Sequence, residues 1–100
     1  METAKGIETN LWNKILKQLV ADHWIVKFKY DNFDAGIDYD LVILKKGGEE
    51  ILFGWDNWFE GEIQCSLQRM KDIERIANQK FKKGEPENLK PEIIKLYRKS

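Results

Sequence analysis

The sequence has little of what nucleophilic enzymes and zinc sites are built from. Its 100 residues include one cysteine, Cys65, and one histidine, His23. A single cysteine excludes an internal disulfide, and no motif around either residue sets a base beside a nucleophile, as a catalytic triad requires. The cysteine and histidine spacing of zinc sites is also absent. We therefore interpret His23 as a residue at a helix–strand junction and Cys65 as a small buried thiol.

The chain also lacks net charge and a long apolar run. Seventeen basic and seventeen acidic side chains cancel, so net charge favours no class of partner. No apolar run approaches the roughly 18 residues that a membrane-spanning helix needs, and no charged-then-apolar leader opens the chain. We expect no membrane association and a cytoplasmic protein. A protein secreted by a leaderless route would have the same features.

The charges are unevenly distributed along the chain. Residues 31–63 carry nine acidic side chains and two lysines, whereas residues 78–100 carry seven basic and three acidic side chains. This pattern predicts an acidic sheet region and a basic C-terminal segment. The length predicts one domain over residues 1–100. Within it we expect residues 1–6 to fray and residues 85–100 to form a basic segment with a short helix.

Alternating apolar and polar residues predict a series of strands. The alternation runs through residues 24–30, 37–44, 49–55 and 59–65, with the period of two that is typical of half-buried strands. Residues 31–36 contain turn-forming Asp, Asn and Gly, and we expect them to form a loop. The sequence therefore predicts a sheet of three to four strands that follow one another.

A glycine pair at residues 47–48 marks a hairpin, because glycine supplies the positive φ that tight turns need. A loop of three or five residues would pair Ile43 with Ile51 and gather the apolar residues on one face. A loop of two or four residues would instead bury strand aspartates beside Phe53 and Trp55. We therefore predict the odd-numbered loop.

Three helices are expected around these strands. Apolar residues at helical spacing predict a helix over residues 11–22, capped by Thr9 or Asn10, and a second helix from a Ser66 cap to a terminating Gly84. Pro91 suits the first turn of a short final helix. The order α-β-β-β-β-α-α predicts the α+β class, with an antiparallel meander sheet and helices packed on one face.

Clustered carboxylates suggest one enzymatic alternative. Asp38 and Asp40 share a strand face, and Asp56 is near in sequence, so the three could hold a hard cation and support a metal-dependent hydrolase. No calcium-loop spacing is present. A solvated acidic face is the other interpretation of the same residues.

The order helix, three strands, helix resembles the core of PD-(D/E)xK nucleases. The segment DLVI at residues 40–43 resembles the motif on the second strand of that family. The resemblance implies water activated by a metal ion. Where the family has acid-x-Lys on its third strand, this chain has FGWD at residues 53–56, and no lysine lies between residues 47 and 69.

A second alternative is nucleic-acid binding through the basic C-terminal segment. The order α-β-β-β-α also resembles a double-stranded-RNA-binding domain, which needs basic side chains placed for phosphates. The loop that would enter the groove is DNFD at residues 31–34, which would repel phosphate. The basic residues that would carry this function are Lys80, Lys82, Lys83, Lys90, Lys95, Arg98 and Lys99.

Tryptophan and carboxylates together favour protein binding. Trp12 and Trp24 occupy expected core positions, whereas Trp55 and Trp58 flank a turn expected at residues 56–57. Exposed rings would supply contact area, and carboxylates around them would steer a basic partner. The alternative is that Trp55 and Trp58 both pack under the helices.

We therefore favour a non-enzymatic binding module without a metal or cofactor, whose acidic-aromatic sheet face docks a basic protein. Small immunity and inhibitor proteins are similar in composition, which is an analogy and not a family match. We call the expected contact residues the acidic-aromatic surface: Asp34, Asp38, Asp40, Trp55, Asp56, Trp58, Glu60 and Glu62.

Overall fold

The computed structural model describes residues 1–34, 37–89 and 91–99. Its elements in chain order are β1 (Glu2–Ile7), α1 (Thr9–Ala21), β2 (Ile25–Asp34), β3 (Ile37–Lys46), β4 (Glu49–Asp56), β5 (Glu60–Cys65), α2 (Leu67–Ala77), β6 (Lys82–Lys83) and α3 (Pro91–Lys99). Within these described ranges, no helix is both long and apolar enough to cross a membrane.

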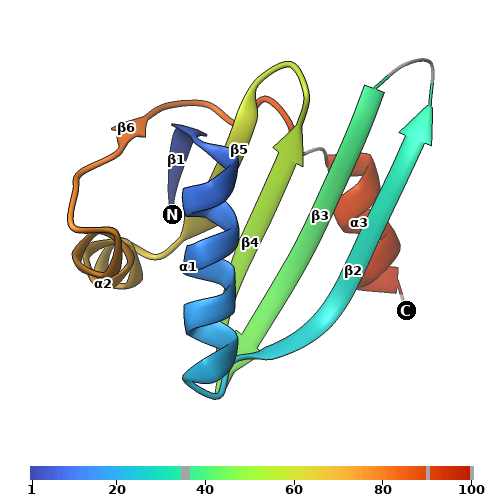
Figure 1. Ribbon diagram of the computed structural model, residues 1–100. Coiled ribbons are helices and arrows are strands. Elements are labelled where there is room, and N and C mark those ends of the chain that lie inside the picture. The colour runs from blue at the N-terminus through green and yellow to red at the C-terminus, as the bar shows by residue number, and fades with distance from the viewer. Residues whose placement is uncertain (35–36, 90, 100) are drawn as a thin grey trace.

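Strands β2 to β5 form the predicted antiparallel meander, and β1 and β6 extend it beyond β5. The order across the sheet is β2-β3-β4-β5-β1-β6, and each neighbouring pair is antiparallel. The α+β class is confirmed, but the sheet has six strands where three to four were expected. The predicted order of elements missed the first and last of these strands (Figure 1).

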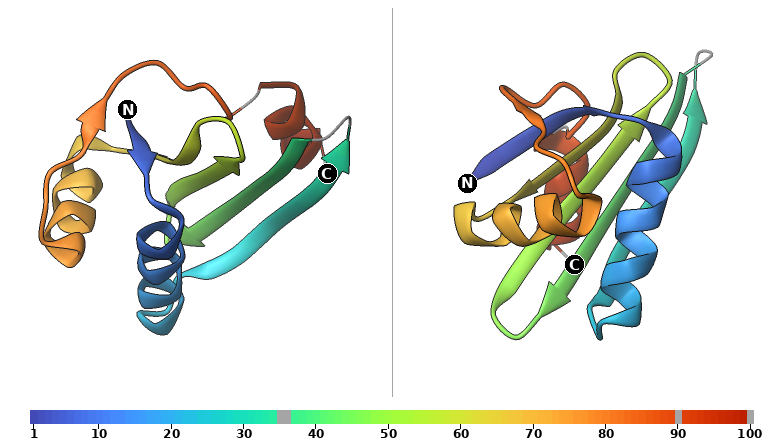
Figure 2. Two further views of the ribbon diagram at one scale, coloured as in Figure 1. Left: turned by 45° about the horizontal axis from the view of Figure 1, so that its top comes forward. Right: turned by 60° about the vertical axis from the view of Figure 1, so that its left-hand side comes forward.

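Helices cover both faces of the sheet, not one face as predicted. α1 and α2 lie on one face and α3 lies on the other (Figures 1 and 2). Two separate groups of buried apolar residues result, one on each face. The sheet is therefore the middle layer of the molecule.

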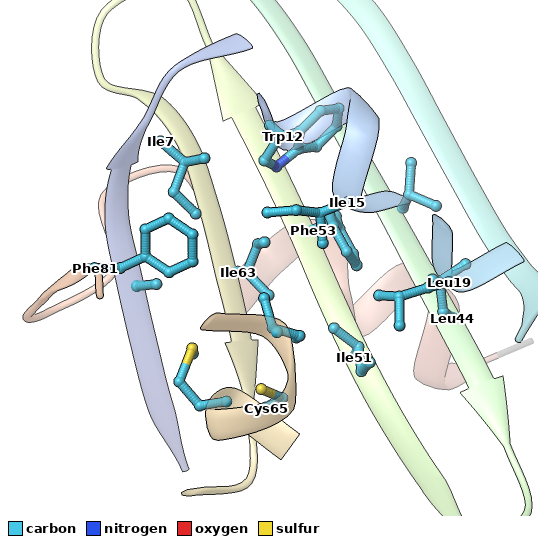
Figure 3. Packing of buried hydrophobic residues seen from close by; sticks show 14 of the residues in the cluster. Ile7, Trp12, Ile15, Leu19, Leu44, Ile51, Phe53, Ile63, Cys65 and Phe81 are labelled. Atoms are coloured by element: carbon cyan, nitrogen blue, oxygen red, sulfur yellow. The ribbon is translucent and has the colours of Figure 1, made fainter. Parts of the chain in front are cut away.

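The larger apolar core lies under α1 and α2. Each helix buries a stripe at helical spacing, formed by Trp12, Ile15 and Leu19 in α1 and by Met70 and Ile73 in α2. All five belong to the core on this face of the sheet, and Figure 3 shows the three from α1 packed on the strands. The ring of Trp12 meets that of Phe53 edge to face at 5.7 Å between centroids. The edge-to-face geometry is favourable for aromatic rings.

The smaller core lies under α3. Because each core includes residues of β3, this strand is buried on both faces. Leu41 and Ile43 belong to the group under α3, with Leu89 ahead of that helix. Val42 and Leu44 belong to the group under α1. Four consecutive buried residues are typical of a strand that is covered on both sides.

The burial of β3 on both faces explains why the predicted hairpin loop, with an odd number of residues, is wrong. Lys46 pairs with Glu49, which leaves a two-residue loop at residues 47–48 whose first glycine has φ +61°. In this register Asp40 lies opposite Trp55, the arrangement that we expected the protein to avoid. Asp40 is only partly buried, so the register does not bury its charge in an apolar core.

Two segments that we expected to be irregular are strands. The first residues of the chain do not fray: β1 pairs with β5 on one side and β6 on the other, and it buries Thr3 and Ala4. The backbone of residues 31–34, expected in a loop, continues β2 in register with β3.

The ends of α2 follow one prediction and depart from another. Ser66 caps the helix as predicted, because its Oγ accepts a hydrogen bond from the Arg69 backbone N–H at 3.2 Å. The helix ends at Ala77, followed by Asn78 in the left-handed region at φ +55°. Asn78, and not the predicted Gly84, therefore terminates α2.

Candidate protein-binding surface

The acidic-aromatic surface belongs to one end of the sheet. β2 ends and β3 begins at the same end at which β4 ends and β5 begins, at the top of Figure 1. The side chains of Asp34 and Asp38 lie outside the described part of the structure, which gives only their backbone in β2 and β3. Asp40 is partly buried in β3.

The loop between β4 and β5 presents two aromatic side chains. Asp56 pairs with Glu60, so residues 57–59 form a three-residue loop in place of the turn expected at residues 56–57. Trp58 is 69% exposed and Phe59 is 50% exposed. The sequence singled out Trp58 but assigned Phe59 to the following strand, so Phe59 is a candidate contact residue that the strand pattern concealed.

Asp56 is buried at the base of this loop and holds its backbone. Its side chain is buried, and its Oδ1 accepts hydrogen bonds from the backbone N–H groups of Trp58 at 3.0 Å and Phe59 at 2.6 Å. A carboxylate that accepts from the N–H groups ahead of it fixes the turn that follows. The structure therefore gives Asp56 a role inside the loop, and its buried side chain offers little surface to a partner.

Glu60 closes the loop with an uncommon backbone conformation. Its φ is +60°, a region that non-glycine residues enter only when neighbouring contacts hold them there. One such contact is the hydrogen bond that the Asn88 side chain Nδ2 donates to the Glu60 carbonyl oxygen at 2.7 Å. Asn88 is fully buried, whereas the side chain of Glu60 is exposed.

Glu62 is also removed from the predicted surface by burial. Its side chain is fully buried and accepts three backbone hydrogen bonds from residues 87–89, a segment that we call the strap. Oε2 accepts from Glu87 at 2.8 Å, and Oε1 accepts from Asn88 at 3.1 Å and Leu89 at 3.3 Å. A buried carboxylate needs such donors. Glu62 therefore anchors the strap and, through it, the start of α3.

A glycine beneath the strap makes this arrangement possible. Gly54 is the cross-strand partner of Glu62. A Cβ on Gly54 would overlap Asn88 Oδ1 and the side chain of Leu89. The strap can therefore lie against the sheet only because position 54 has no side chain.

Trp55 packs against the core under α1 and is only partly exposed. Its ring is partly buried against the core under α1, and its Nε1 donates a hydrogen bond to Thr9 Oγ1 at 3.0 Å. Of the two tryptophans left open by the sequence, Trp55 packs under a helix and Trp58 is exposed. Neither of the two sequence alternatives, both packed or both exposed, describes the pair.

The register separates the aspartates of the hydrolase alternative. Asp40 and Asp56 lie on opposite faces of the sheet, since Asp40 pairs with Trp55 and Asp56 pairs with Tyr39. The carboxylate of Asp56 is occupied by the loop. Among the residues that the structure describes, no group of three His, Cys, Asp or Glu side chains could hold a metal ion.

The lone cysteine and histidine lie where the sequence suggested. His23 is exposed between α1 and β2. Cys65 is buried at the end of β5, and desolvation by this burial raises the pKa of its thiol from 9.0 to about 12. At neutral pH the thiol is protonated, which makes it a poor nucleophile.

The described basic residues of the C-terminal segment form two separate groups. Lys82 and Lys83 lie in β6 at one edge of the sheet, and Lys83 pairs with Glu74 at 2.6 Å. Arg98 lies in α3 on the far face and pairs with Glu50 at 3.3 Å (Figure 1). The basic residues that the structure describes therefore do not form one continuous surface, and Lys90 and the side chain of Lys99 lie outside the described part.

Comparison with known proteins adds no family to this picture. The chain matches no protein-family model, no curated protein and no solved structure.

Proposed function

We propose that this protein is a non-enzymatic binding module that docks a basic protein partner through the loop between β4 and β5. Trp58 and Phe59 form the apolar centre of the contact, and Glu60 lies beside them. Asp40, and Asp34 and Asp38 by their positions in the sequence, add negative charge at the same end of the sheet. Asp56, Asn88 and Glu62 position the loop without touching the partner.

The observation that supports this proposal most is the exposure of two adjacent aromatic rings on a loop whose backbone is held. Trp58 is 69% exposed, yet the N–H groups of Trp58 and Phe59 are both bound by the Asp56 carboxylate. Aromatic side chains are the commonest anchors of protein interfaces. A loop that is ordered before binding loses less entropy on association.

The charges around the loop indicate the chemistry of the partner. Carboxylates around an apolar centre raise the rate of encounter with a basic surface and disfavour acidic ones. Because the exposed carboxylates are in water, their contribution should weaken as salt is added. A basic protein surface fits this arrangement, and a nucleic acid does not.

Capture from a lysate of the source cells tests the proposal. The immobilised protein is compared with a Trp58→Ser/Phe59→Ser variant and with Leu67→Ser/Ile76→Ser, a matched control that removes two exposed apolar side chains from α2. We expect the loop variant to lose about tenfold or more of the captured protein, as loss of a main anchor would cause. The α2 control should capture the same amount as the parent protein.

Glu60→Lys provides the electrostatic arm of the same experiment. We expect it to reduce capture at low salt and to have less effect at high salt, where charges are screened. Equal capture by the parent protein and the Trp58→Ser/Phe59→Ser variant would contradict the proposal. Capture that nuclease treatment abolishes would point instead to the nucleic-acid alternative.

A further inference from the structure

The two edges of the sheet differ greatly in length. β6 closes one edge with two residues, whereas β2 forms the other edge with ten residues, Ile25–Asp34. The outer side of an edge strand carries backbone N–H and C=O groups that can pair with another strand. Short edges give little opportunity for such pairing, so β2 is the edge at which a further strand could be added.

Apolar side chains flank the first part of this edge. Ile25 is 56% exposed and Val26 is 46% exposed, and Val20 of α1, beside Val26, is 44% exposed. Val20 and Val26 also line a groove of about 290 Å³ between α1 and β2. α1 therefore leaves the outer part of the sheet uncovered on this face.

The charges along β2 suit a second copy of the same strand. Pairing with β3 is irregular around Lys27 but continuous from Phe28 to Asp34, so the regular part of the edge is seven residues long. In this sequence Lys29 precedes Tyr30 and Asp31 follows it. A strand that runs antiparallel to itself about Tyr30 brings the basic position of each copy opposite the acidic position of the other.

We propose that two copies of this chain associate through antiparallel pairing of their β2 strands about a two-fold axis at Tyr30. Neighbouring registers are less favourable: an axis at Lys29 would oppose two lysines, and an axis at Asp31 would oppose two aspartates. A two-fold axis makes both contacts identical and limits assembly to a dimer. The dimer would join two sheets of six strands into one of twelve. This inference does not depend on the loop between β4 and β5.

Sedimentation velocity over protein concentrations from micromolar to about 1 mM tests the proposal, because an interface of this small size gives weak association. We expect a reversible monomer–dimer equilibrium. Amide hydrogen exchange within residues 28–32, which the axis at Tyr30 sets opposite one another, should slow as the concentration rises. A monomer at every concentration would overturn the proposal.

Charge reversal tests the register. Lys29→Glu and Asp31→Lys each place like charges opposite one another twice per dimer, so we expect each variant alone to dimerise about tenfold or more weakly. A mixture of the two variants should form a heterodimer, and the double variant with both changes in one chain should dimerise again. Lys14→Glu, which changes an exposed lysine of α1, is the control and should dimerise as the parent does.

Two results would contradict the pairing at β2. One is a dimer that Lys29→Glu does not weaken, since association would then use another surface. The other is failure of the mixed variants to associate when each retains the melting temperature and circular dichroism of the parent protein.

Discussion

The carboxylate of Asp56 accepts the backbone N–H of Phe59 at 2.6 Å, across the loop whose two aromatic rings face solvent. The same oxygen accepts the N–H of Trp58. A buried acid at the base of the loop therefore holds the backbone of the two residues that we propose as contacts. The shape of the loop depends on a residue that the partner does not touch.

Removing the Asp56 carboxylate should loosen this loop. We expect Asp56→Ala to lower the free energy of unfolding by about 2 kcal/mol, because two hydrogen bonds to a charged acceptor are lost. Asp56→Asn retains one acceptor oxygen and should lose about 1 kcal/mol or less. Urea denaturation measures both. Equal losses for the two variants would show that the acceptor oxygen is not what holds the loop.

Removing the Glu62 carboxylate should release the strap. Glu62→Ala leaves three buried N–H groups without their acceptor, and we expect a loss of roughly 4 kcal/mol in the free energy of unfolding. Glu60→Gln changes an exposed carboxylate two residues away and should change stability by less than about 0.5 kcal/mol. Urea denaturation of both variants, with hydrogen exchange at residues 87–89, measures the difference between Glu62→Ala and Glu60→Gln. Similar losses would contradict the anchoring role of Glu62.

A methyl group at position 54 should displace the strap without altering any hydrogen-bonding side chain. We expect Gly54→Ala to cost about 2 kcal/mol, because its Cβ would overlap Asn88 and Leu89. Gly48→Ala is the matched control, since no atom lies within 4 Å of a Cβ there. It should change stability by less than about 0.5 kcal/mol. Thermal unfolding measures the stability of both variants. A larger loss of stability for Gly48→Ala than for Gly54→Ala would contradict the overlap of the Gly54→Ala Cβ with the strap.

The buried thiol of Cys65 should make stability depend on alkaline pH. Burial raises its pKa from 9.0 to about 12, so below pH 9 the thiol is protonated in both the folded and unfolded states. Between pH 9 and about 12 the unfolded state loses the proton first, and the free energy of unfolding should fall as the pH rises.

Cys65→Ala should remove this part of the alkaline loss, which urea denaturation from pH 8 to 11 measures. The parent protein should also react slowly with a thiol reagent at pH 8 unless it is unfolded. Rapid labelling of the folded protein would contradict the burial of Cys65.

Local patterns in the sequence predicted the meander and its helices. The stripe of Trp12, Ile15 and Leu19 and the Ser66 cap follow from spacing and side-chain chemistry within one turn of a helix. The alternation that predicted the strands is equally local. These features need no knowledge of what lies on the far side of the sheet.

Contacts between distant parts of the chain account for what the sequence did not predict. Glu62 alternates with apolar residues, so the strand pattern predicts that its side chain faces solvent. The strap, some 25 residues later in the chain, covers this side chain and buries it. β1 has a polar sequence and becomes a strand because β5 and β6 flank it. The hairpin register failed for the same reason, since α3 buries the face that we assumed to be in water.

The most direct test of the central claim is photo-crosslinking from the loop between β4 and β5. A photoreactive phenylalanine at position 58 is compared in the source cells with the same group at position 67, which is 60% exposed on α2. We predict one discrete crosslinked species from position 58 that contains a basic protein, and none from position 67. No crosslink from position 58, or the same species from both positions, would contradict docking through Trp58 and Phe59.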